Sequence, residues 1–194
     1  MRVILTVLVS FFLVVSCTSN ECTSPEVQAP TSGRAVLDGV VRRDRDGRFY
    51  TSGFSFEQGE VLQVTDPNEP VADIHLLFTY SAEGEFTGLA FSGGGMVPEF
   101  SHIARVEDAG EARAAFDSTR CIPDDAYFSS FVMPLRVYDI WAVKTVDGRF
   151  GKVLLTKTFW CKQEWDSAGV RVSRAYGEIT FDWVFQPDGS TCFD

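Results

Sequence analysis

The sequence predicts an all-β domain of mainly antiparallel sheets, with at most one or two short helices. Three observations support this: short segments alternate apolar and polar residues, turn pairs such as Asp-Gly separate them, and a single stretch favours a helix. The length of 194 residues suits one domain. We expect a signal peptide at 1–16, a flexible tether at 17–34 and one β domain at 35–194.

The N-terminal segment has the pattern of a bacterial lipoprotein signal. Arg2 supplies a positive charge, residues 3–15 form an apolar run, and Ser16 precedes Cys17. Such signals are cleaved before the cysteine, which then carries a diacylglycerol and acyl chains such as palmitate. The apolar run is too short for a membrane span. An ordinary secretory signal and a short transmembrane anchor are the alternatives.

The signal predicts where the protein resides. Lipidation of Cys17 would anchor an exported protein to the membrane through acyl chains. Thr18 follows the cysteine, and the absence of Asp there resembles sorting to the bacterial outer membrane, facing the periplasm or the cell surface. The following Ser-, Thr- and Pro-rich residues have almost nothing to bury, which is typical of a tether.

The mature chain is strongly acidic. Cleavage removes Arg2 and no acid, which leaves 16 basic and 27 acidic side chains and a net charge of −11. Such a surface repels phosphate backbones, so we expect no nucleic-acid partner.

Four cysteines remain beside the lipidated one. An even number in an exported chain predicts two disulfides, and three connectivities stay open. A metal site is the alternative, but the spacing is wide and no C-x-x-C pair occurs. The four are Cys22, Cys121, Cys161 and Cys192.

Turn signals divide the first half of the domain into strands. A charged segment at 42–48 ends in an Asp-Gly turn pair, and Gln58-Gly59 turns the chain into a strand at 61–65. The next strand, at 74–80, places Ile74, Leu76, Phe78 and Tyr80 on one face and His75, Leu77 and Thr79 on the other.

The second half contains one helical segment and a hairpin. Residues 106–116 are rich in Ala, Glu and Arg, which favours a short helix despite Gly110. The hairpin spans 138–159 around Asp147-Gly148, a pair suited to a tight turn. Alternation at 178–185 predicts the last strand.

Two segments resemble the HmuY-like haem-binding lipoproteins. The first is 53–66, in which an aromatic-Ser-Phe strand turns at a glycine into a Val-rich strand ending in Thr-Asp. The second comprises 138–159 and 178–185, with Lys-Val in the second hairpin arm and Ile-Thr-Phe in the last strand. The family's usual Trp before Asp73 is Ala72 here, and the segment between Gly95 and Tyr138 does not align with the family's iron-ligand region.

The resemblance implies a non-catalytic β domain that captures haem or a related porphyrin. Its partners would be haem or a haem-carrier protein, and an outer-membrane receptor to which haem is passed. Neutral imidazoles and thioethers are suitable axial iron ligands. Our candidates, in order, are His102 in a loop-like segment, His75 in mid-strand, Met133 and Met96.

Enzyme motifs are mostly absent from the sequence. Gly93-Gly94-Gly95 lacks the lysine of a P-loop, and no G-x-S-x-G elbow occurs. We therefore expect no enzymatic activity. The main alternative to haem capture is a lipid-anchored module that binds a protein or glycan, or has a structural role; a hydrolase ranks third.

Overall fold

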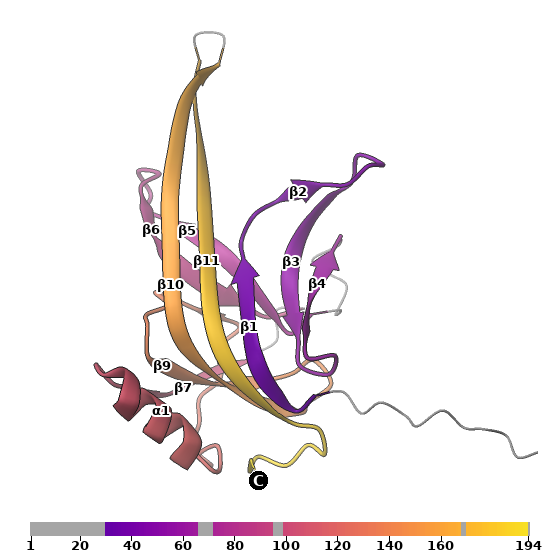
Figure 1. Cartoon of the computed structure of the whole chain (residues 1–194), viewed down its shortest axis with the longest axis vertical. Helices are drawn as coiled ribbons and strands as arrows, with labels where there is room; N and C mark the ends of the chain where they lie inside the picture. Colours follow the sequence, from indigo (N-terminus) through magenta and orange to yellow (C-terminus); the bar gives the residue numbers. More distant parts are fainter. Residues whose placement is uncertain (1–29, 66–71, 95–98, 168–169, 194) are drawn as a thin grey trace, which may run out of the picture.

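The protein is built from two antiparallel β-sheets and one short helix, as the sequence predicts (Figure 1). The computed structural model describes residues 30–65, 72–94, 99–167 and 170–193. The first sheet has the strand order β1–β11–β10–β9–β7. Its strands are β1 (Ser32–Asp38), β7 (Phe100–Arg105), β9 (Asp139–Lys144), β10 (Phe150–Ser167) and β11 (Val170–Gln186).

The second sheet has the order β2–β3–β5–β6–β8. β4 pairs with the edge of β3 that lies opposite β5. These strands are shorter and are joined mostly by tight turns. They are β2 (Arg42–Arg43), β3 (Phe49–Ser55), β4 (Glu60–Val64), β5 (Ile74–Tyr80), β6 (Phe86–Ser92) and β8 (Phe131–Val132).

An aromatic core joins the two sheets. Phe54 on β3 meets Phe181 on β11 edge to face, with ring centroids 5.2 Å apart. Phe91 on β6 also contacts Phe181 edge to face and stacks on Phe100 of β7. All four side chains are fully buried, so this contact set fixes how one sheet lies on the other.

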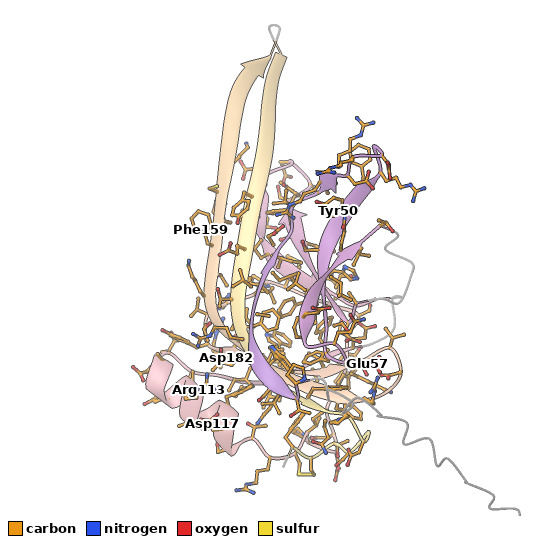
Figure 2. All side chains as sticks on the ribbon, turned by 45° about the vertical axis from the view of Figure 1, so that its right-hand side comes forward. Tyr50, Glu57, Arg113, Asp117, Phe159 and Asp182 are labelled. Carbon is orange, nitrogen blue, oxygen red and sulfur yellow. A yellow bond between two sulfur atoms is a disulfide. The ribbon has the colours of Figure 1, made fainter. Side chains whose placement is uncertain are left out.

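The helix α1 (Ala109–Ser118) covers the outer face of the first sheet. The Asp108 carboxylate caps its N-terminus by accepting hydrogen bonds from the backbone N–H groups of Gly110 and Glu111. Arg113 reaches from the helix to Asp182 on β11, as Figure 2 shows. The expected helix is therefore present, displaced by two to three residues toward the C-terminus.

The hairpin of β10 and β11 is the longest element of the fold. The register pairs the strands from Phe150 with Gln186 to Ser167 with Val170, so the last strand begins well before the expected residue 178. β9 pairs with β10 only up to Leu154, and β1 pairs with β11 only up to Glu178. The far half of the hairpin consequently projects beyond the rest of the sheet (Figure 1).

Two expectations from the sequence are wrong. His102 lies within β7, not in a loop, because a register shift against β9 between His102 and Ala104 breaks the alternation that would reveal the strand. The expected tether extends too far, since β1 begins at Ser32 and pairs with β11 from that residue.

One of the two predicted disulfides is present. It joins Cys121 to Cys192, which are 71 residues apart in the sequence. Cys161, half-buried on β10, has no disulfide partner among the described residues. Cys22, like the signal and Cys17, lies outside the described residues, so the second predicted disulfide, which would now join Cys22 to Cys161, stays a prediction.

Candidate functional site

Four aromatic side chains gather where the long hairpin passes the hairpin of β5 and β6. The ring centroids of Trp160 and Phe86 lie 4.1 Å apart at an interplanar angle of 35°. Phe86 also contacts Phe78 and Tyr80, with centroid distances of 6.2 and 6.1 Å. We call Phe78, Tyr80, Phe86 and Trp160 the aromatic cluster.

A glycine lets the long hairpin approach β5 and β6 this closely. Gly177 on β11 lies opposite Trp160. A Cβ atom added at Gly177 would lie 2.7 Å from Cδ2 of Leu89 and 2.8 Å from Cε1 of Phe78. Any larger residue at 177 would therefore push the hairpin away and open the contact between Trp160 and Phe86.

The aromatic cluster is partly open to solvent. Trp160 is 51% exposed and Tyr80 is 52% exposed, although both touch Phe86. Large rings usually bury most of their surface, and adjacent half-exposed rings mark binding surfaces. The cluster can thus offer ring faces to a flat apolar ligand.

His75 is buried on β5, on the face opposite Ile74 and Leu76, as the sequence predicts. Burial lowers the pKa of its imidazole, so the ring is neutral. Its Nε2 atom is covered and has no hydrogen-bond partner among the described residues. The ring has the right protonation state for a metal ligand, but this nitrogen is closed to an incoming iron.

His102 is more open but already has neighbours. Its Nε2 lies 3.6 Å from Oδ1 of Asp139, and its ring packs edge-on against Trp141 with centroids 4.7 Å apart. It belongs to the edge strand of the first sheet, whereas His75 belongs to the second. The fold therefore places the two histidines on different sheets.

Of the two candidate methionines, Met133 lies among the residues that the structure describes. Met133 directly follows β8 and is half-exposed. The next two residues run along β6: Pro134 lies near Gly88, and the Leu135 N–H donates to the Leu89 carbonyl. Met133 thus follows a strand that pairs with β6, which supplies Phe86 to the aromatic cluster, and His75 lies on β5, which supplies Phe78 and Tyr80. Met96 lies outside the described residues.

Sequence reasoning missed a pair of buried acids, Glu99 and Asp73. Glu99 is fully buried, and neither carboxylate oxygen has a hydrogen-bond partner among the described residues. Burial, followed by the nearby charge of Asp73, raises the pKa of Glu99 to about 8. Asp73 accepts a hydrogen bond from the Phe56 N–H, and burial raises its pKa as well.

Asp73 also lines a pocket of about 360 Å³, together with the charged side chains of Glu57, Asp147 and Arg149. Arg149 is paired with both Glu57 and Asp147, so the pocket already contains its own cation. Across the described ranges, no three His, Cys, Asp or Glu side chains are grouped so as to hold a metal ion. The pocket therefore lacks the features of a metal centre, and the aromatic cluster is the stronger candidate.

Comparison with known proteins adds no identification. No protein-family model matches the chain. No curated protein matches it either. Within the residues that the structure describes, no helix has both the length and the apolar character that a membrane crossing needs.

Proposed function

We propose that this protein is an exported, lipid-anchored, non-catalytic binding protein whose ligand is haem or a related porphyrin. The observation that carries the proposal is the half-exposed aromatic cluster where the long hairpin passes β5 and β6. A porphyrin is a broad flat ring, and offset stacking on Trp160 or Tyr80 would bury its apolar face. The resemblance of 53–66 and 138–159 to HmuY-like proteins supports the same ligand class.

In this proposal neither histidine binds the iron. The Nε2 of His75 is covered, and His102 packs against Trp141 on a strand that contributes nothing to the cluster. Stacking therefore supplies the main interaction, and Met133 is the remaining described donor. If a histidine bound the iron, the absorption spectrum of the haem complex would change in His75→Ala or in His102→Ala. Stacking predicts that both variants keep the wild-type spectrum.

A haem titration tests the proposal. We expect the detergent-solubilised full chain to give a shifted and saturable Soret band, measured against detergent alone. Trp160→Ala should weaken binding about three- to tenfold, because an aromatic pair contributes roughly 0.5–1.5 kcal/mol. The matched control is Tyr127→Ala, which removes an 85% exposed ring outside the cluster. Absence of a Soret shift, or equal losses in both variants, would refute the proposal.

The alternative is a surface module that binds a protein or glycan. The same exposed rings would then form its contact surface, because aromatic faces also stack on sugars and on other side chains. This alternative predicts that the Soret band of haem does not shift when the protein is present, so the same titration separates the two functions.

A further inference from the structure

The turn between β2 and β3 is basic, although the protein as a whole is acidic. Residues 42–48 contain four arginines and two aspartates, a net charge of +2, whereas the whole chain carries −10. We call these residues the basic turn. The hairpin that carries them extends beyond the end of β4 (Figure 1). Because salt screens exposed charges over about 8–10 Å, the basic turn can attract an anion that the rest of the surface repels.

Hydrogen bonds within the basic turn hold it in shape and engage one of its two acids. The Asp44 N–H donates to the Arg48 carbonyl, and the Asp44 carboxylate accepts a 2.8 Å hydrogen bond from the Arg48 N–H. Gly47 has the positive φ of 86° that glycine tolerates best. The Asp44 carboxylate is therefore bonded to the backbone of the turn and not to a guanidinium group.

Two arginines of the basic turn are available to a ligand. The side chains of Arg45 and Arg48 are exposed and make no hydrogen bond or ion pair with a described residue. By contrast, Arg42 pairs with Asp38, and Arg43 donates to a backbone carbonyl of the turn. Side chains that end in nitrogen project from this hairpin in Figure 2. The unpaired guanidinium groups can bind phosphate oxygens without first breaking an ion pair.

Large apolar side chains flank the basic turn. Phe49 is 65% exposed, and Val41 is also exposed. The guanidinium carbon of Arg43 lies 5.7 Å from the centre of the Phe49 ring, so a cation and an apolar ring share one surface. A bilayer surface can take up both, because its headgroups carry negative charge above an apolar layer. A soluble polyanion would pair with the arginines but would leave the Phe49 ring in water.

From this arrangement we infer that the hairpin of β2 and β3 docks on an anionic phospholipid bilayer. Arg45 and Arg48 bind headgroup phosphates, and the Phe49 ring enters the boundary between headgroups and acyl chains. Because the hairpin extends beyond its neighbouring strand, the basic turn can reach the headgroups while the acidic surface stays in solvent. This contact involves a different part of the molecule from the aromatic cluster and does not depend on haem.

Hydrogen–deuterium exchange of the full chain on vesicles tests the inference. One set of vesicles contains phosphatidylcholine alone, and the other contains an equal amount of phosphatidylglycerol, so any attachment through residues 3–15 is common to both. We expect slower amide exchange at 42–50 only with phosphatidylglycerol. The double variant Arg45→Gln, Arg48→Gln should weaken this protection by about fivefold for each arginine, the effect typical of a basic side chain at an anionic bilayer. Phe49→Ser should weaken it as well.

The matched control is the double variant Arg120→Gln, Arg136→Gln. It removes the same charge from two exposed arginines outside the hairpin and should keep the protection. Equal exchange on the two kinds of vesicle, equal losses in the two double variants, or protection that persists in high salt would overturn the inference. Protection by soluble poly-L-glutamate but not by phosphatidylglycerol vesicles would also overturn it, and would indicate an acidic protein as the partner.

Discussion

The ammonium group of Lys152 on β10 donates a 2.7 Å hydrogen bond to the carbonyl oxygen of Phe116 in the last turn of α1. A second hydrogen bond of the same length goes to the carbonyl of Thr119, just beyond the helix. The Nζ also lies over the rings of Phe116 and Phe193. A single buried lysine thus ties the end of the helix and the C-terminal segment to the first sheet.

Replacing this lysine should loosen the helix. Lys152→Met keeps the apolar stem but leaves two carbonyl groups without their donor, and each such loss costs roughly 1–3 kcal/mol. We expect the free energy of unfolding to fall by about 2 kcal/mol, measured by urea denaturation. Lys157→Met, at an exposed position of the same strand, should change it by less than about 0.5 kcal/mol. Equal stability of the two variants would contradict the role of Lys152.

Glu99 should make stability depend on pH. Its pKa in the folded protein is about 8, above the usual value of 4.5, so the folded state holds the proton more tightly than the unfolded state does. The free energy of unfolding therefore decreases as pH rises from about 4.5 to about 8. Glu99→Gln removes the ionisation and should stabilise the protein by about 1–3 kcal/mol at about pH 9, with little effect at about pH 4.

Denaturation of wild type and Glu99→Gln across this pH range measures the effect. Glu85→Gln is the control, because Glu85 is an exposed acid in the turn between β5 and β6. A constant difference between wild type and Glu99→Gln at every pH would show that the folded and unfolded states bind the Glu99 proton equally.

The disulfide between Cys121 and Cys192 should stabilise the C-terminal segment. It links Cys192, beyond β11, to the segment that follows α1. Replacing both cysteines with serine should lower the free energy of unfolding by about 2–4 kcal/mol.

Peptide mapping under non-reducing conditions checks both pairs. We expect one cross-linked peptide joining Cys121 to Cys192 and a second joining Cys22 to Cys161. Alkylation of Cys161 in protein isolated from its native compartment would rule out the second disulfide.

Lipidation should depend on Cys17. The apolar run at 3–15, followed by Ser16 and Cys17, is the basis of this prediction. Cys17→Ser should abolish incorporation of radioactive palmitate into the exported protein. Cys22→Ser is the control and should keep the label, since Cys22 lies beyond the cleavage pattern. Equal labelling of wild type and Cys17→Ser would refute the lipoprotein assignment.

Local sequence patterns determined the β class and several turns. The Asp147-Gly148 pair forms the turn between β9 and β10, and Gly148 has the positive φ of 85° that such turns favour. Alternation in 74–80 correctly separated the core face from the face that carries His75. These features depend on a few adjacent residues, which is why the sequence alone reveals them.

The tertiary structure decided the candidate site, because its contacts join residues that are distant in the chain. Phe86 and Trp160 meet only after the long hairpin packs on β5 and β6 at Gly177. The burial of Glu99 likewise depends on packing that the local sequence does not show. The alternation of apolar and polar residues within one strand does not show which strands become its neighbours. A bulge such as the one after His102 also disrupts that alternation. Sequence thus determined several of the strand segments, and packing between the sheets decided which side chains come together.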